Sequence, residues 1–353
     1  MSEPRVTIVV VPRERFSYTQ ASLESIYQYT DVPFKLVYVD GNSPAKVSAY
    51  LQKKAEEKGF KLFRTDHYLI PNHARNLGLK FVDTEYLVFL DNDVIVSAGW
   101  LTALIICADT TGAAVVTPLT CEQEPLHQLV HCAGGENRII TDVKGKRHLR
   151  EKMYQQKRQT ENVRPQMHRA PTELAEFHCM LVRTEVFQST GPLDPKLLCT
   201  KEHLDFCMTV AAAGETIYFE PDAIVTYVPG PPADWSDLHF YLLRWSDAWT
   251  LESLQHLQKK WDLAEDGYFK TKYKKLGWRR RKTVITPLTR RLSFGFKNPP
   301  LRKALQLIDR WLNSYLTDRY AKKVLSKMPE TTPTALSTGS PVSRLNEQPS
   351  SIK

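Results

Sequence analysis

The segment that most constrains the fold is a short apolar run that ends in two carboxylates. Residues 86–90 read Tyr-Leu-Val-Phe-Leu, and Asp91, Asn92 and Asp93 follow directly. An apolar run of this length predicts a strand buried on both faces, as in parallel α/β sheets. Such sheets bind ligands at the carboxyl ends of their strands, so the two aspartates predict a site for Mg²⁺ or Mn²⁺ beside substrate phosphates. The alternative is a solvated junction in which both aspartates only form a turn.

Strand and helix signals alternate along the first 230 residues. We expect strands at 6–11, 35–40, 61–64, 113–117, 216–219 and 223–228, and helices at 17–29, 43–58 and 72–80. This alternation predicts an α/β fold with a mostly parallel sheet that helices flank on both faces. No Gly-x-Gly-x-x-Gly follows the first strand, which argues against a dinucleotide-binding Rossmann domain. The polar, basic segment 141–173 predicts either a functional lid or binding loop, or a disordered stretch.

Length and composition exclude several classes of protein. The 353 residues suffice for about two domains of ~150 residues, each with its own core. No window approaches the ~18 apolar residues of a membrane-spanning helix, and the N-terminal apolar stretch is too short for a secretory signal. The six cysteines lack Cys-x-x-Cys spacing and lie in apolar segments, which predicts buried, reduced thiols in a cytosolic protein.

Charge divides the chain into two unlike parts. Between Tyr268 and Met328 there are 18 lysines and arginines but two acidic residues, a local net charge of +16. The last 25 residues balance at zero, so the first 267 must carry −7 to give the total of +9. A Pro-Gly-Pro-Pro cluster begins at Pro229. We therefore predict a catalytic domain at 1–228, a helical basic extension at 229–328 and a disordered tail at 329–353.

The basic extension has the features of an interfacial membrane segment. Arg279 to Lys282 are consecutive basic residues, and an apolar stripe from Leu301 to Leu316 contains Trp311 and Tyr315. Such a segment would hold the protein at an anionic membrane surface. The alternatives are a solvated appendage and a nucleic-acid-binding face, and no recognised nucleic-acid motif accompanies the patch.

The order of motifs resembles that of the GT-A-fold glycosyltransferases, most closely the inverting family 2, over roughly residues 6–228. In that family the first strand ends in a proline-containing loop that touches the nucleotide, where this chain has Pro12 and Arg13. The second strand ends in an acidic residue that binds the base, matched here by Asp40. A later Ala-Arg-Asn faces the diphosphate, which assigns Arg75 to the donor.

The central motif of the resemblance is the family's Asp-x-Asp. It implies that Asp91 and Asn92 contact the donor and that Asp91 and Asp93 hold Mn²⁺ or Mg²⁺. The Trp-Leu pair that follows in the family begins here at Trp100, which with His178 is assigned to the acceptor side. Taken without the resemblance, His178 is more often a satisfied core histidine.

The second half of the family pattern contains the general base. Its usual Glu-Asp-x-Asp reads Glu202-His203-Leu204-Asp205 here, so histidine stands where the family has the catalytic aspartate. Glu202 is the first candidate for the base, and Asp205 and His203 are the others. Structural alternatives are a helix N-terminal carboxylate for Glu202 and a buried partner of Arg183 for Asp205. Many relatives place a metal-binding histidine on the last strand, where this chain has Tyr227.

The resemblance implies a metal-dependent glycosyltransferase that moves a sugar from a nucleoside-diphosphate sugar, such as a UDP-sugar, to a lipid-linked or polysaccharide acceptor. It would act as a peripheral protein at the cytoplasmic face of a membrane. A nucleotide-sugar-binding scaffold with a decayed catalytic motif and a nucleotidyltransferase are the alternatives. His127 and His131 stand four residues apart beside Cys132, but no further ligand completes a zinc-binding pattern, so we do not expect zinc there.

Overall fold

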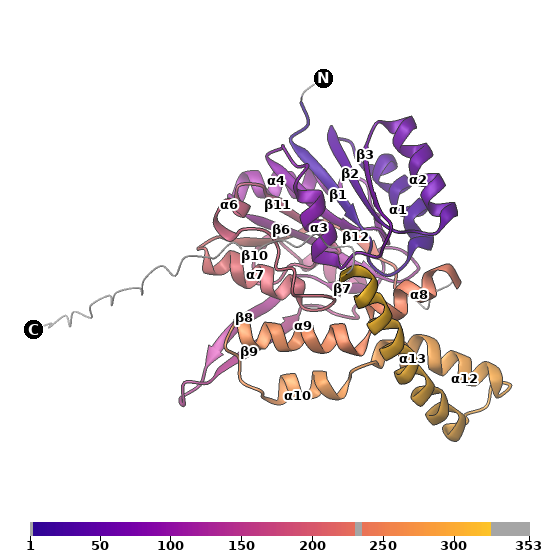
Figure 1. The fold of residues 1–353 in the computed structure, drawn as a ribbon. Coiled ribbons are helices and arrows are strands. Elements are labelled where there is room, and N and C mark those ends of the chain that lie inside the picture. The colour runs from indigo at the N-terminus through magenta and orange to yellow at the C-terminus, as the bar shows by residue number, and fades with distance from the viewer. Residues whose placement is uncertain (1–2, 230–234, 326–353) are drawn as a thin grey trace, which may run out of the picture.

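The structure is a computed structural model that describes residues 3–229 and 235–325 (Figure 1). A ten-stranded mixed sheet lies at its centre, and a separate hairpin stands beside it. Along the main path the strands are β10 (Ala170–Thr172), β12 (Ile217–Tyr227), β6 (Val115–Glu122), β11 (Cys179–Arg183), β4 (Tyr86–Asp91), β1 (Val6–Val11), β2 (Phe34–Gly41) and β3 (Lys61–Thr65). Two short strands lie off this path: β5 (Val94–Val96) pairs with β12, and β7 (Val130–Cys132) pairs with β6.

The sheet combines two parallel parts. Strands β3, β2, β1 and β4 run parallel, as do β6 and β12, and β11 lies antiparallel between β4 and β6. In β1, Ile8 and Val10 pack on one face of the sheet and Val9 and Val11 on the other. A strand buried on both faces needs apolar residues at successive positions, which explains its unbroken sequence. The predicted α/β fold is confirmed.

Helices cover both faces of the sheet. On one face lie α1 (Thr19–Tyr29), preceded by η1 (Phe16–Tyr18), then α2 (Ala45–Lys58) and α4 (Trp100–Thr111). The opposite face carries α3 (Pro71–Leu79), α6 (Val186–Thr190) and α7 (Glu202–Ala212). Helix α2 ends as predicted at Gly59, whose φ of 71° gives the left-handed cap. All six cysteines are free and buried, as predicted.

Some predicted boundaries differ from the structure. The two strands expected at 216–219 and 223–228 are one strand, β12, whose register with β6 shifts between Glu220 and Ile224. Helix α3 begins at Pro71 and ends at Leu79, one residue earlier than the predicted 72–80, and the Asn72 side chain donates to the carbonyl of Asp194.

The segment 141–173, predicted as a functional lid or binding loop or as a disordered stretch, has regular secondary structure. It begins in the β8 (Gly135–Thr141) and β9 (Arg147–Met153) hairpin and continues through α5 (Thr160–Val163) and η2 (Arg164–Gln166) to β10. The hairpin is held to α7 because Asn137 donates to the carbonyl of Leu204 and Lys201 Nζ lies 2.7 Å from Glu151 Oε1.

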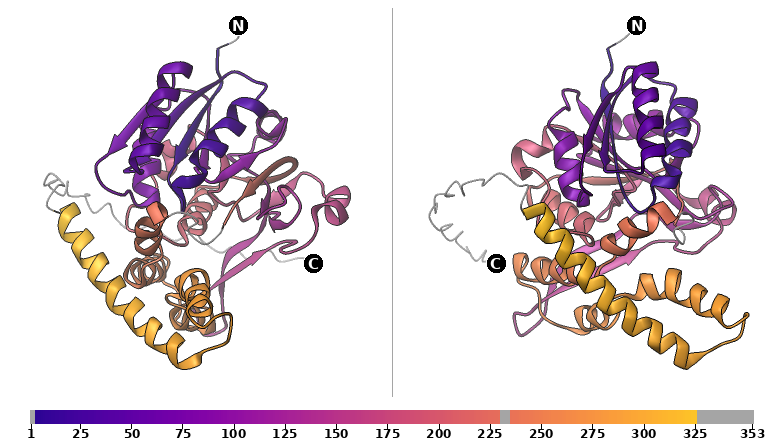
Figure 2. Two further views of the ribbon diagram at one scale, coloured as in Figure 1. Left: turned by 90° about the vertical axis from the view of Figure 1, so that its right-hand side faces the viewer. Right: turned by 45° about the vertical axis from the view of Figure 1, so that its right-hand side comes forward.

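The C-terminal part forms a helical layer along one side of the sheet domain, and α12 and α13 extend beyond it (Figures 1 and 2). Its helices are α8 (Trp235–Arg244), α9 (Asp247–Lys260), α10 (Gly267–Lys274), α11 (Trp278–Arg280), the π-helix η3 (Arg281–Ile285), α12 (Thr286–Leu292) and α13 (Pro299–Leu325). Within residues 3–229 and 235–325 we find no helix whose length and apolar character would let it cross a bilayer. The predicted tail at 329–353 lies outside the described residues.

Helix α13 is polar on its inner side and apolar on its outer side. Inward, Asp309 pairs with Arg280 at 3.0 Å, and Asn313 accepts from the backbone of Asp247. Outward, Trp311 is 69% exposed, and Leu307, Ile308, Leu312 and Tyr315 are exposed as well. The helix therefore docks through polar contacts and through Tyr320, which packs against Tyr68 and Trp249, and leaves the apolar side chains of its outer side uncovered.

Candidate active site

The candidate site lies where the carboxyl ends of β1, β2 and β4 meet. Because β1 pairs in parallel with both neighbours, the loops that follow these three strands share one edge of the sheet. They contain the predicted donor residues Pro12 and Arg13, Asp40, and Asp91 to Asp93. The structure thus brings together the motif residues that the sequence spreads over 80 positions.

Asp91 is fully buried and fully partnered. Arg75 Nη2 donates to Oδ1 at 3.0 Å, His178 Nδ1 lies 3.0 Å from Oδ2, and Arg13 Nε lies 3.5 Å from Oδ2. Burial opposes ionisation, but the His178 hydrogen bond and the two guanidinium groups lower the pKa of Asp91. Arg75 is itself fully buried and stacks over Phe177, so it is not a surface arginine.

Asp93, unlike Asp91, has no side-chain partner among the residues that the structure describes. It is fully buried, and neither carboxylate oxygen has a hydrogen-bond partner within residues 3–229 and 235–325. Burial and the nearby charges of Asp91 and Glu14 raise the pKa of Asp93 well above its usual range. A buried carboxylate without a partner is costly, and a divalent cation is the partner that such an oxygen ligand suits. The site therefore fits the metal ion that the sequence implies.

Asn92 and Asp40 shape the loops around these aspartates. Asn92 Oδ1 accepts from the backbone N–H of Arg13, and its Nδ2 donates to the carbonyl of Arg15, which fixes the loop after β1. Asp40 accepts from the N–H and hydroxyl of Ser43 and pairs with Arg64. Both residues are thus used within the fold, and Asp40 forms a turn with Ser43.

Gly41 keeps the first two loops close together. A Cβ on Gly41 would lie 3.1 Å from Pro12 Cγ and 3.2 Å from the backbone nitrogen of Leu69. This close approach places Pro12 directly beside the end of β2, so the two loops form one wall.

Arg13 links the aspartate loop to the start of α7. Its Nη1 lies 3.8 Å from Glu202 Oε1, and Arg244 Nη2 from α8 donates to the same oxygen at 3.3 Å. Burial opposes ionisation, but Arg244 and Arg13 lower the pKa of Glu202. Glu202 and Arg13 both line a cavity of about 430 Å³, to which Trp245 also contributes.

Around this cavity, three histidines surround the carboxylate of Glu176. Its Oε2 lies 2.8 Å from His131 Nε2 and 3.8 Å from His178 Nε2, and its Oε1 lies 3.8 Å from His203 Nε2. Burial favours the neutral ring, but Glu176 and Glu122 raise the pKa of His131 to about 9. His178 and His203 have lowered pKa values because burial dominates.

Two predicted site residues lie elsewhere. Asp205 accepts from Lys260 Nζ at 2.8 Å and from Trp261 Nε1 at 2.7 Å, so its side chain anchors α9 and does not pair with Arg183 as one alternative expected. Trp100, the first residue of α4, is fully buried in the core, and its Nε1 donates to Thr30. An acceptor-side role for Trp100 is incompatible with this burial, because the start of α4 packs into the sheet.

A second cavity, of about 550 Å³, adjoins the first and shares His131 and Arg279 with it. In it, Glu14 accepts from Tyr227 Oη at 2.8 Å and from Arg279 Nη1 at 3.0 Å. Tyr227 stacks on His178 with 4.0 Å between the ring centroids. The position where many relatives have a metal-binding histidine is thus part of this ion-pair network.

The family model that describes glycosyl transferase family 2 matches residues 7–188, which is more than half of the chain. The chain belongs to glycosyl transferase family 2. This membership confirms the predicted family and its GT-A-type fold.

Individual relatives of this family 2 chain are remote. An uncharacterized glycosyltransferase of Rickettsia bellii (strain RML369-C) is 26% identical over 93 residues, which is 26% of this chain and 13% of the relative's length. A mannosyltransferase from Pyrobaculum calidifontis, solved with GDP-Man and Mn²⁺, has a TM-score of 0.48 and 16% identity, covering 93% of this chain and 89% of that one. GalNAc-T7, solved with UDP, GalNAc and Mn²⁺, has a TM-score of 0.46 and 17% identity, covering 68% and 48%.

Sequence reasoning missed the contribution of the C-terminal helices to the family 2 site. Arg244 and Arg279 approach the cavity from α8 and α11, and Arg280 is buried between α9 and α13. The prediction that Arg279 and Arg280 face a membrane is therefore wrong. Glu176 also escaped notice, because nothing in its local sequence distinguishes it. The excess of arginine after residue 240 was the one sequence signal that could have indicated a role for these helices at the site.

Proposed function

We propose that this family 2 protein is a metal-dependent, inverting glycosyltransferase that takes its sugar from a UDP-sugar or a related nucleoside-diphosphate sugar. The observation that carries this proposal is Asp93, a fully buried carboxylate whose two oxygens lack partners among the described residues, at the end of a central strand. Asp93 would hold Mn²⁺ or Mg²⁺, which when bound neutralises the charge that develops on the leaving diphosphate. The acceptor would be a glycan or a lipid-linked glycan.

The protein's own residues supply positioning and proton transfer. Arg13 and Arg279 line the cavity and would bind diphosphate oxygens, whereas Arg75 keeps Asp91 ionised and fixed in place. Asp40 would orient the nucleotide base from the end of β2. Glu202 is an ionised carboxylate at the cavity wall, and in this proposal it accepts the proton of the acceptor hydroxyl.

A donor screen tests the proposal directly. With Mn²⁺ present, we expect one nucleoside-diphosphate sugar to raise Tm by roughly 5–10 °C when supplied at about 100 times its Kd. The same donor should release nucleoside diphosphate slowly when no acceptor is added. The proposed function is contradicted if no nucleoside-diphosphate sugar raises Tm, either with or without Mn²⁺.

The same screen separates the two alternatives. Donor binding without any release of nucleotide would favour a scaffold with a decayed motif, for which His203 and Tyr227 are the sequence arguments. Release of pyrophosphate instead of nucleoside diphosphate would favour a nucleotidyltransferase.

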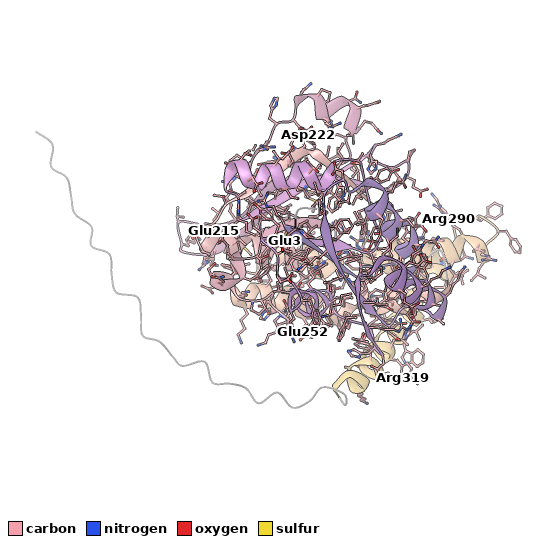
Figure 3. All side chains as sticks on the ribbon, turned by 90° about the horizontal axis from the view of Figure 1, so that it is seen from above. Glu3, Glu215, Asp222, Glu252, Arg290 and Arg319 are labelled. Carbon is pink, nitrogen blue, oxygen red and sulfur yellow. The ribbon has the colours of Figure 1, made fainter. Side chains whose placement is uncertain are left out.

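We also propose that α12 and α13 bind an anionic membrane surface, where a lipid-linked acceptor would be found. The loop between them exposes Phe294 at 92% and Phe296 at 75%, beside the exposed stripe of α13 that contains Trp311. Basic side chains surround this apolar surface. Figure 3 shows Arg290 of α12 at this end of the molecule, whereas Glu3, Glu215 and Asp222 lie on the sheet domain. Exposed apolar and basic groups together are what an anionic bilayer binds.

Vesicle binding tests the membrane surface. Burying a Phe or Trp side chain contributes about 1.5–3 kcal/mol, so F294S/W311S should weaken binding to phosphatidylserine-containing vesicles by at least about 100-fold. I140S/V143S is the matched control, because both residues are exposed apolar side chains on the β8–β9 hairpin. Binding should also fall with added salt. Equal loss in the control, or binding to neutral vesicles alone, would contradict the proposal.

A further inference from the structure

In the cluster around Glu176, one pair of facing atoms has no hydrogen between them. Asp91 accepts the Nδ1–H of His178, so the Nε2 of His178 carries a lone pair, and this atom faces Glu176 Oε2 at 3.8 Å. Two hydrogen-bond acceptors that face one another in a buried site lack a donor between them, and a metal cation is a group that would bind both. Glu176 is 6% exposed and His178 is 5% exposed.

His131 completes the arrangement from β7. One ligand atom from each of His131, Glu176 and His178 lies within 4.8 Å of the others. Around a tetrahedral zinc ion the ligand atoms are about 3.4 Å apart, given bond lengths of about 2.0–2.1 Å. Although His131 Nε2 and Glu176 Oε2 are 2.8 Å apart, Oε2 has no hydrogen bond of acceptable geometry among the described residues. Small side-chain shifts would therefore suffice to enclose an ion.

In both His131 and His178, the second ring nitrogen, Nδ1, also lies near a carboxylate. The Nδ1 of His178 pairs with Asp91, and the Nδ1 of His131 lies 3.4 Å from Glu122 Oε2. Metal-binding histidines almost always give their second nitrogen to a carboxylate or carbonyl, which orients the ring and raises its basicity. His178 has that arrangement, and Glu122 stands in the corresponding place beside His131 as an ion pair, with each Nε2 near the same carboxylate.

We propose that His131, Glu176 and His178 form a binding site for a borderline transition-metal ion such as Zn²⁺, separate from the Mn²⁺ or Mg²⁺ site at Asp93. Two imidazoles and one carboxylate are a ligand set that favours Zn²⁺ over Mg²⁺, which prefers oxygen ligands alone. Three protein ligands leave a fourth position open. It faces the cavity that Glu202 and His203 also line, where a water molecule or an acceptor hydroxyl would bind.

The spacing of histidines in the sequence did not predict this set of three ligands. The four-residue spacing of His127 and His131 offered a zinc pair without further ligands. In the structure His127 turns away, with its Nδ1 2.6 Å from Thr226 Oγ1. His131 instead meets two residues that lie 45 and 47 positions later in the chain.

Metal titration of the full chain without nucleotide tests this site. We expect one equivalent of Zn²⁺ by calorimetry and by elemental analysis after dialysis, and visible d–d absorption when Co²⁺ is added alone. H131A and E176Q should lose this binding. E122Q keeps all three ligands and should weaken it by about 10–100-fold.

Matched variants separate this site from the donor site. H127A and D93N should bind Zn²⁺ like the unmodified chain, because neither residue belongs to the cluster. The proposal is overturned if the unmodified chain binds no Zn²⁺ or Co²⁺, or if D93N abolishes binding that H131A retains. Circular dichroism of each variant checks folding, and the titration of the unmodified chain decides the question even if a variant does not fold.

Discussion

Asp93→Asn is expected to lower kcat/KM by about 10³-fold and to remove the dependence of donor binding on Mn²⁺. A bound metal supplies several kcal/mol of charge stabilisation, and each 1.36 kcal/mol corresponds to a factor of ten in rate. Because the oxygens of Asp93 have no partner among the described residues, the free energy of unfolding without divalent ions should fall by no more than about 1 kcal/mol. Steady-state kinetics, donor titration with and without Mn²⁺, and urea unfolding measure these three quantities.

Asp91→Asn is the matched control for that experiment. This carboxylate is held by Arg75, Arg13 and His178, so neutralising it leaves buried charges without their partner. Removing one member of a buried pair costs about 3–5 kcal/mol, so Asp91→Asn should be clearly less stable than Asp93→Asn. Mn²⁺-dependent turnover that survives in Asp93→Asn would disprove the assignment of the metal.

Glu202→Gln is expected to lower kcat by about 10²–10⁴-fold, the usual contribution of a general base, while donor affinity stays nearly unchanged. Glutamine preserves the shape of the side chain but cannot accept the proton of the acceptor hydroxyl. The measurement is kcat with saturating donor and acceptor, together with the Kd of the donor. Full activity in this variant would exclude Glu202 as the base.

Two neighbours on the same helix complete the comparison. Asp205→Asn should reduce stability, because Asp205 anchors Lys260 and Trp261, but it should leave kcat close to that of the unmodified chain. His203→Gln distinguishes the competing base. If His203→Gln lowers kcat more than Glu202→Gln does, the imidazole in the family's aspartate position performs the proton transfer.

The fold was predictable because its strands are buried on both faces. β1 and β4 are continuous apolar runs, and the helices between them have clear stops, such as Gly59. The two strands predicted at 216–219 and 223–228 form one strand, β12. Their continuity was not predictable, because the register of β12 with β6 shifts between Glu220 and Ile224, and this irregularity interrupts the strand pattern in the sequence. Likewise, the hairpin of β8 and β9 has charged strands that are only partly buried, so its sequence lacks an apolar pattern.

The site was predictable only where it follows strand ends. Asp91, Asp93 and Arg13 could be placed because parallel strands end at one edge of a sheet. The difference between Asp91 and Asp93 was not visible, since it depends on Arg75 and His178 arriving from α3 and β11. The grouping of His131 with Glu176 is likewise a tertiary contact that no spacing in the sequence records.

Arg279 and Arg280 are adjacent in the chain but serve different parts of the molecule. Arg279 pairs with Glu14 in the cavity wall, and Arg280 pairs with Asp309 of α13. One peptide bond therefore couples the outermost helix to the chamber in which we place the chemistry. A fragment that stopped at residue 228 would keep every family motif but would lack part of the cavity wall. The two parts that the sequence separates therefore build one cavity together.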